Sequence, residues 1–134
     1  MHLRLIPELG GDGTFCGVIV LNDTGSNIFT VFTSDFQHLG NTQEYDGWIG
    51  DGSVTDANGT ATVLPQLIVQ VRLVDNHSEP WSDWIFERAI VRTPHPSVDR
   101  LSGRGFRDVF YIGTGPGNHV LAVSASKGGL TTLL

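Results

Sequence analysis

Basic residues are scarce in this chain of 134 residues. It has 8 lysines and arginines against 14 aspartates and glutamates, which gives a formal net charge of −6 at pH 7. The basic residues are scattered and form no run. Nucleic acids and anionic membrane surfaces are bound through clustered lysine and arginine side chains. We therefore expect neither as a partner.

Cysteine and long apolar runs are also nearly missing. The single cysteine, Cys16, excludes a disulfide within the chain and is expected to be a small core residue. No signal peptide is present, and no apolar run approaches the ~18 residues that would cross a membrane. These absences favour a soluble, intracellular protein. They fit equally well a domain excised from a longer polyprotein, whose address signals would lie elsewhere.

Two further absences concern metal ligands and helices. No histidine pair or cysteine cluster has metal-ligand spacing, so neither a metal nor another cofactor is expected. Long helical periodicity is lacking, whereas the chain has 17 glycines and is rich in Val, Ile, Thr and Phe. This composition favours an all-β fold. The length suits one domain, over residues 1–134.

Turn signals divide the chain into hairpins. Asn58-Gly59 predicts a tight turn between strands over 53–55 and 60–64. The glycines at 128–129 predict another hairpin over about 119–134. Between these hairpins, residues 83–92 predict a strand with a break near Glu87.

Two tryptophans precede or begin that strand. Trp81 and Trp84 are interpreted as packing residues, and an aromatic binding platform is the alternative.

The most informative stretch is an apolar run that ends in a carboxylate, Val18-Ile19-Val20-Leu21-Asn22-Asp23-Thr24-Gly25-Ser26. Its four apolar residues predict a strand buried on both faces, the end of a longer strand over 14–21. A carboxylate beside a core must be hydrogen-bonded, paired or neutralised. Thr24 and Ser26 offer hydroxyls, and Gly25 lets backbone N–H groups approach closely. The alternative is an ordinary hairpin turn at 22–25.

The residues that follow give Asp23 a family context. Ser34 is a candidate helix N-cap and Gly40 stands just past the expected end, so a short helix is predicted between them. The whole unit resembles the active-site segment of retropepsin-like aspartic peptidases: a hydrophobic strand, Asp-Thr-Gly-Ser, a loop with a buried aliphatic residue and a short helix. The resemblance implies that Asp23 is the catalytic aspartate. Asn22 departs from the family, which usually has an apolar residue there.

Two later segments match the same family in the right order. Ala57-Asn58-Gly59 resembles the tip of the flap, the hairpin that covers the substrate in retroelement-type members, although Gly50-Asp51-Gly52 is a rival for that tip. Leu101-Ser102-Gly103-Arg104-Gly105-Phe106 resembles the element that supports the active-site loop, with Gly103 and Arg104 in the supporting positions. Ser102 replaces a usual apolar residue.

A short helix is expected after Gly103, because Phe106, Val109 and Phe110 fall on one helical face. Arg104 and Arg107 are interpreted either as solvated or as partners of Asp108 or of an active-site carboxylate.

The resemblance implies an all-β fold of a particular kind. We expect a closed, acid-protease-like β-barrel with a flap hairpin and one or two short helices. Its core would cover about residues 14–111, and the hairpin over about 119–134 would be an addition.

The resemblance also implies a mechanism that one copy of the chain cannot perform. It uses two carboxylates sharing one proton, whereas this chain has a single Asp-Thr-Gly. A C2 homodimer is therefore expected to hydrolyse an extended peptide or polyprotein with water activated by paired Asp23 carboxylates. Thr24 would brace the two loops, Gly25 would contact the substrate backbone and Ser26 would hydrogen-bond the carboxylate. Dimerisation is expected to use the terminal strands, above all 119–134.

Two alternatives belong to other classes. One is a catalytically inactive retropepsin-like binding or dimerisation module, which Asn22, Ser102 and the added tail favour. The other is a β-barrel in which Asp23 only closes a turn.

Overall fold

The computed structural model describes residues 1–40, 42–55, 58–117 and 121–133. Its strands are β1 (His2–Arg4), β2 (Phe15–Gly17), β3 (Phe29–Phe32), β4 (Trp48–Thr55), β5 (Ala61–Arg72), β6 (Ile85–Arg92), β7 (Tyr111–Thr114) and β8 (Leu121–Ser124). Its helices are the short 3-10 helices η1 (Pro7–Leu9) and η2 (Thr33–His38) and the α-helices α1 (Arg104–Val109) and α2 (Lys127–Leu133). The predicted mainly β class and the short helices after the Asp23 loop and after Gly103 are confirmed.

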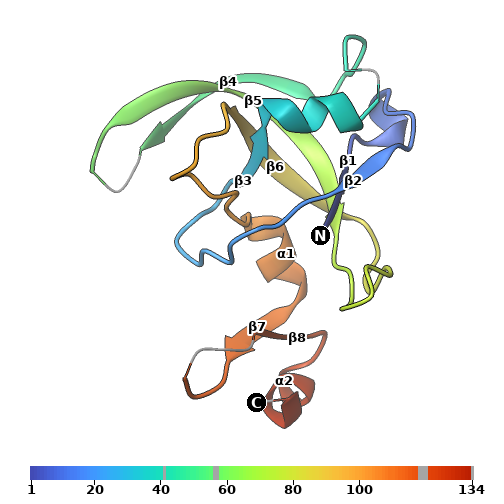
Figure 1. Cartoon of the computed structure of the whole chain (residues 1–134), viewed down its shortest axis with the longest axis vertical. Helices are drawn as coiled ribbons and strands as arrows, with labels where there is room; N and C mark the ends of the chain where they lie inside the picture. Colours follow the sequence, from blue (N-terminus) through green and yellow to red (C-terminus); the bar gives the residue numbers. More distant parts are fainter. Residues whose placement is uncertain (41, 56–57, 118–120, 134) are drawn as a thin grey trace.

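Six strands form one sheet in the order β2-β1-β5-β6-β3, with β4 added on β5 (Figure 1). The pair β3–β6 is parallel and the other pairs are antiparallel. Within the described residues β2 and β3 remain open edges, so the expected closed barrel is not observed.

Strand β5 has two halves with different roles. Its C-terminal half buries Leu67, Val69 and Val71 between β1 and β6, whereas residues 61–63 are exposed. That exposed half pairs with β4 to form an arm that reaches out from the sheet (Figure 1). The pairing of Thr55 with Ala61 confirms the predicted hairpin. Ala57, at its expected tip, lies outside the described residues.

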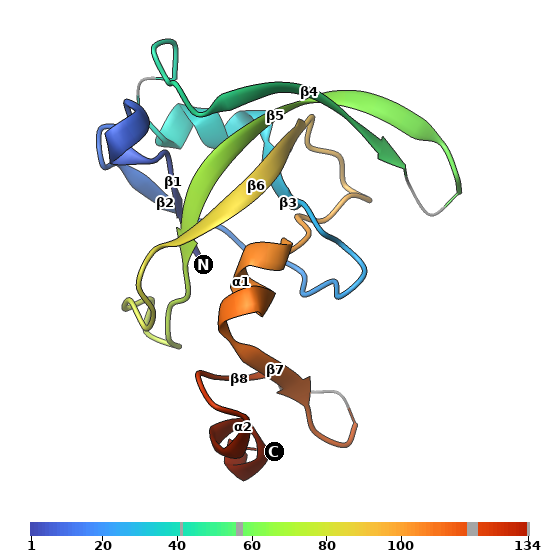
Figure 2. The same ribbon diagram turned by 180° about the vertical axis from the view of Figure 1, so that it is seen from behind.

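The hydrophobic core is formed by the inward residues of β1, β3, β5 and β6 together with Phe106 of α1. Phe29 and Val31 of β3 pack with the inward residues of β5 and β6. Helix α1 packs against β6 and contributes the buried Phe106 (Figure 2). Cys16 is half-buried against this core, close to the expectation.

The apolar run before Asp23 is not a doubly buried strand. Strand β2 ends at Gly17, Val18 is buried, and Ile19 is 89% exposed. Leu21 makes only a single bridge, with Leu101. The run was expected to lie in the sheet interior, but it follows an edge strand, and only one of its faces meets the core.

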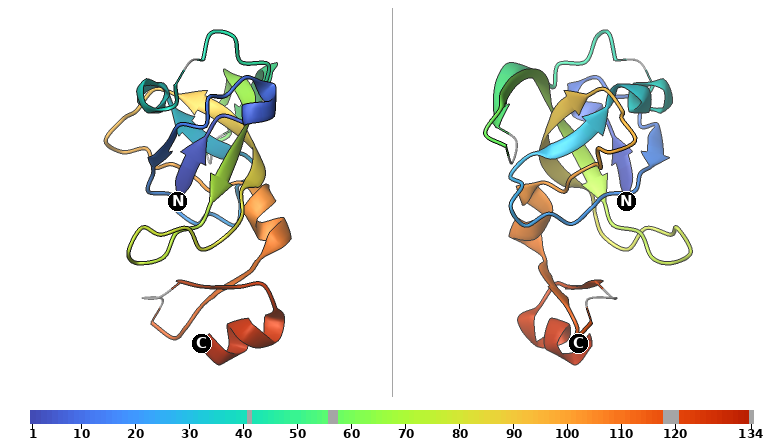
Figure 3. Two further views of the ribbon diagram at one scale, coloured as in Figure 1. Left: turned by 90° about the vertical axis from the view of Figure 1, so that its right-hand side faces the viewer. Right: turned by 60° about the vertical axis from the view of Figure 1, so that its left-hand side comes forward.

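The C-terminal part also differs from the expectation. Strand β8 pairs with β7, and residues 127–133 form α2 instead of a returning strand. The Ser126 hydroxyl accepts the N–H of Gly129 at 3.0 Å, so the serine caps a helix where the glycines predicted a turn. Strands β7 and β8 and helix α2 lie beyond α1, away from the six-stranded sheet (Figure 3). No helix of the described residues is long and apolar enough to span a membrane.

Candidate functional site

The Asp23 loop is held at both ends by one short segment, residues 100–102. On one side Leu21 donates its N–H to the carbonyl of Arg100 at 2.8 Å, and Ser102 donates its N–H to the carbonyl of Leu21 at 2.9 Å. On the other side Thr30 donates its N–H to the carbonyl of Leu101 at 3.0 Å. The segment thus runs between the two ends of the loop and fixes the distance between them.

Within the loop, the Asp23 carboxylate is positioned by the backbone. The Gly25 N–H donates to Asp23 Oδ1 at 2.9 Å, and the Ser26 N–H donates to the Asp23 carbonyl at 3.1 Å. A Cβ on Gly25 would lie 3.3 Å from Asp23 Oδ1, a tight contact. The predicted close approach of a backbone N–H is confirmed. Thr24 is exposed on the loop.

The hydroxyl of Ser26 does not bind the carboxylate, contrary to expectation. It donates to the carbonyl of Ile28, two residues farther along the chain, at 2.8 Å.

Ser102 and Arg107 complete the support of the loop. The buried Ser102 hydroxyl accepts the Asp23 N–H at 3.0 Å. Arg107 donates from Nη1 to the Asp23 carbonyl at 2.8 Å and to Ser102 Oγ at 2.9 Å, and from Nη2 to the Ser26 carbonyl. One guanidinium therefore holds both ends of the Asp23–Ser26 turn.

Gly103 and Arg104 were expected to support the loop, and the structure gives the contacts of each. The Arg104 side chain is 72% exposed and pairs with Asp108 at 3.4 Å, so Arg107 takes the role expected of Arg104. Gly103 is buried at the start of α1, where a Cβ would overlap the carboxyl of Glu87 and come 3.0 Å from the Phe29 nitrogen. The sequence did hold one signal for Arg107. A buried hydroxyl such as that of Ser102 needs a hydrogen-bond partner, and Arg107 is that partner.

Glu87 is the residue that sequence reasoning missed. The strand β6 runs through this position without the expected break, and the side chain is 2% exposed. Its Oε1 accepts the Phe106 N–H at 2.6 Å. Burial raises the pKa of Glu87 from 4.5 to about 7, although the Phe106 N–H and the Arg107 charge favour the ionised form. A carboxylate inside an apolar strand was the only sequence signal.

Asn22 is the other unusual polar residue near the loop. Its Oδ1 is buried and has no hydrogen-bond partner among the described residues. The side chain lines a cavity of about 300 Å³ together with apolar residues of the 18–20 segment and of β8. An apolar residue would fit this place without an unsatisfied oxygen.

A cavity of about 700 Å³ connects the Asp23 loop to the hairpin arm. Asp23, Gly25 and Ser26 line it from the loop, and Ser53, Val54 and Thr55 line it from β4. The cavity lining also includes Arg92, Val98 and Leu101. Thr24, Gly103 and Arg104 do not line it, nor do Asn58 and Gly59 farther along the arm.

The rival flap tip is not a turn. Gly50, Asp51 and Gly52 lie inside β4, where they pair with β5. The hairpin tip therefore lies beyond Thr55.

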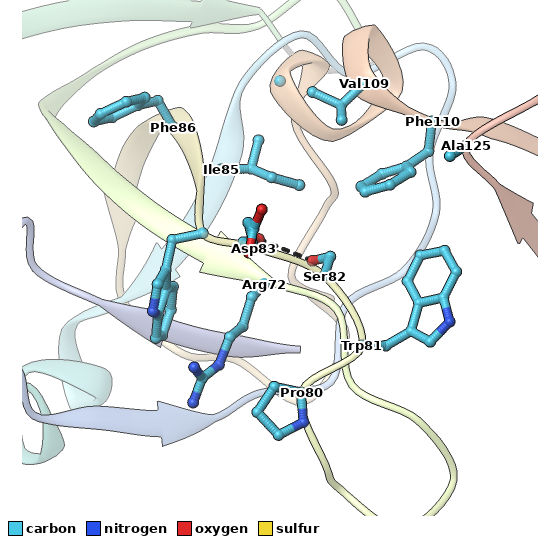
Figure 4. Close-up of a pocket in the computed structure, with 12 residues that line it drawn as sticks. Arg72, Pro80, Trp81, Ser82, Asp83, Ile85, Phe86, Val109, Phe110 and Ala125 are labelled. Atoms are coloured by element: carbon cyan, nitrogen blue, oxygen red, sulfur yellow. Dashed lines mark hydrogen bonds between the residues drawn. The ribbon is translucent and has the colours of Figure 1, made fainter.

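A second cavity, of about 920 Å³, lies between the 80–86 segment and the end of α1 (Figure 4). Four of its twelve lining residues are aromatic, and we call it the aromatic cavity. Trp81 faces Phe110 with ring centroids 5.5 Å apart, and the Arg72 guanidinium lies 4.2 Å from the ring centroid of Trp84. The tryptophans thus both pack and line a cavity. Asp23 is not part of it.

In the part of the chain that the structure describes, no three histidine, cysteine, aspartate or glutamate side chains are grouped to hold a metal ion. No protein-family model, curated protein or solved structure matches this chain.

Proposed function

We propose that this chain is a retropepsin-like aspartic endopeptidase that works as a C2 homodimer. The observation that carries the proposal is the shared cavity: the carboxylate of Asp23, oriented by the Gly25 N–H, lies on the same cavity as the β4 side of the hairpin arm. The parallel pair β3–β6 beside the loop and the helix after Gly103 support an acid-protease-like arrangement.

The chemistry requires a second carboxylate. In a dyad sharing one proton, one carboxylate draws a proton from water while the other donates to the peptide carbonyl oxygen. Asp23 of a second copy would supply the partner, and the exposed Thr24 is available to brace the two loops. Because the two groups titrate as a pair, we expect activity at mildly acidic pH.

The substrate would be an extended peptide or a polyprotein segment. Among the described residues β4 pairs with β5 alone, so its other edge offers backbone groups to a peptide strand. Opening and closing of the arm would admit the substrate and then exclude water. Residues 61–63 of β5 are exposed, so few apolar contacts fix the outer half of the arm to the rest of the molecule. This suits an arm that opens and closes.

The proposal is tested by peptide-library cleavage across pH, together with sedimentation at micromolar concentration. We expect a dimer whose cleavage is lost in Asp23→Asn and blocked by a statine-type inhibitor. Asp46→Asn is the matched control, because Asp46 is exposed and outside the cavity. A chain that stays monomeric with peptide present, or cleavage that persists in Asp23→Asn, would contradict the proposal.

The second candidate is a catalytically inactive binding or dimerisation module of the same fold. The aromatic cavity favours it, because it is larger than the Asp23 cavity and offers rings as anchors for a partner. Peptide binding without cleavage, weakened by Trp81→Ala and unchanged by Asp23→Asn, would support this function instead.

A further inference from the structure

The buried carboxyl of Glu87 is enclosed by the first turn of α1. Its Oε1 accepts the Phe106 N–H at 2.6 Å, and the Gly105 N–H is also directed to the carboxyl. A Cβ on Gly105 would lie 2.6 Å from Oε1, and one on Gly103 would overlap Oε2. The two glycines leave only enough room for the carboxyl, so this turn is built around Glu87.

The enclosed turn lies between the two residues that hold the Asp23 loop. Ser102, just before Gly103, accepts the Asp23 N–H, and Arg107, just after Phe106, donates to the carbonyls of Asp23 and Ser26. A shift of this turn on β6 would therefore move both contacts of the loop at once.

The surroundings of Glu87 give no other reason for a carboxylate. Its partner on β5 is Val69, and Phe29 of the neighbouring β3 is buried in the same core. The charged groups that act on it, Arg107 and Asp108, both come from α1. Burying a carboxylate costs free energy that an apolar residue would not.

We propose that Glu87 is a positioning residue for Asp23: its carboxyl holds the first turn of α1 on β6, and through Ser102 and Arg107 this turn sets the place of the Asp23 loop. A role of Glu87 in catalysis rests on the proposed peptidase function. The structural link from Glu87 through α1 to the Asp23 loop does not.

The link has a signature that a merely structural residue would lack. The pKa of Glu87 is raised to about 7, so its carboxyl changes charge near neutral pH. The strength of the hydrogen bonds that it accepts from the Gly105 and Phe106 N–H groups changes in the same pH range. The Gly25 and Ser26 amides, which have no direct contact with Glu87, should report that change.

The experiment follows the Gly25 and Ser26 amide signals and the Glu87 carboxyl signal by NMR of the full chain between pH 5 and 9. We expect both amides to share the Glu87 inflection near pH 7 in the wild type, and to lose it in Glu87→Gln. Asp108→Asn makes the same chemical change at an exposed position of α1. Because the Asp108 charge raises the pKa of Glu87, this variant should keep the shared inflection and move it to lower pH. Loop amides that do not follow the Glu87 titration, at whatever pH it occurs, would overturn the inference.

The wild-type titration decides the question even if the variant does not fold. Where cleavage is measurable, Glu87→Leu, which removes the acceptor of the Phe106 N–H, should lower kcat by roughly tenfold with KM changed by less than about twofold, because misplacement of a reacting group acts on the chemical step. A shared inflection in a protein that cleaves no peptide would refute the proposed function and leave the positioning link intact. An unchanged kcat in a folded Glu87→Leu would refute the positioning role.

Discussion

Replacement of Arg107 by methionine tests the support of the Asp23 loop most sharply. Methionine keeps most of the aliphatic length but removes hydrogen bonds to Ser102 Oγ and to the carbonyls of Asp23 and Ser26. Hydrogen bonds from a charged donor contribute about 1.5–3 kcal/mol each, and the low end applies at this half-buried site. Allowing for replacement by water, we expect a loss of about 3 kcal/mol in the free energy of unfolding.

Urea denaturation of Arg107→Met and Arg104→Met measures the difference. Arg104→Met is the matched control, because its only described ion pair is exposed, and such pairs contribute about 0–1 kcal/mol. Amide hydrogen exchange at Gly25 and Ser26 should accelerate in Arg107→Met alone. Equal stability of the two variants, with unchanged exchange in the loop, would refute the reasoning.

Three further predictions concern residues around the same loop. Asn22→Leu should raise the free energy of unfolding by about 1–2 kcal/mol in urea denaturation, since it removes a buried oxygen without a described partner; a loss of stability would contradict this. Gly103→Ala should destabilise by at least ~2 kcal/mol, because its Cβ would overlap the Glu87 carboxyl, and a neutral effect in thermal denaturation would show that the turn is loose. Because the pKa of Glu87 is raised to about 7, the stability that its proton contributes is complete below pH 4.5. It is lost as pH rises through 7, by about 3 kcal/mol in total. The free energy of unfolding of the wild type minus that of Glu87→Gln, measured across pH, should show this loss. Two curves that stay parallel across pH would contradict the prediction.

The features that the sequence predicted correctly are those determined by a few adjacent residues. The Asn58-Gly59 turn signal predicted the β4–β5 hairpin, and the spacing of Phe106 and Val109 predicted α1. The approach of the Gly25 N–H to the Asp23 carboxylate was predicted from a glycine that stands two residues after an aspartate. In each case the determining contact joins residues close in the chain.

The features that the sequence did not predict depend on contacts between distant residues. The contacts of Arg107 with the Asp23 loop join positions more than 80 residues apart, and pattern reasoning selected Arg104 instead. The exposure of Ile19 depends on which strand becomes the sheet edge. Residues 127–133 could form a turn or a helix, and the Ser126 cap decides for the helix.

The most direct test of the central claim is cleavage by mixed dimers of wild type and Asp23→Asn. If each active site uses one Asp23 from each copy, co-refolding equal amounts should reduce cleavage to about half of what the same quantity of wild type gives alone, because mixed dimers carry a broken dyad. Cleavage that depends only on the amount of wild-type chain would show that one Asp23 suffices, and no cleavage by the wild type at any pH would contradict the peptidase itself.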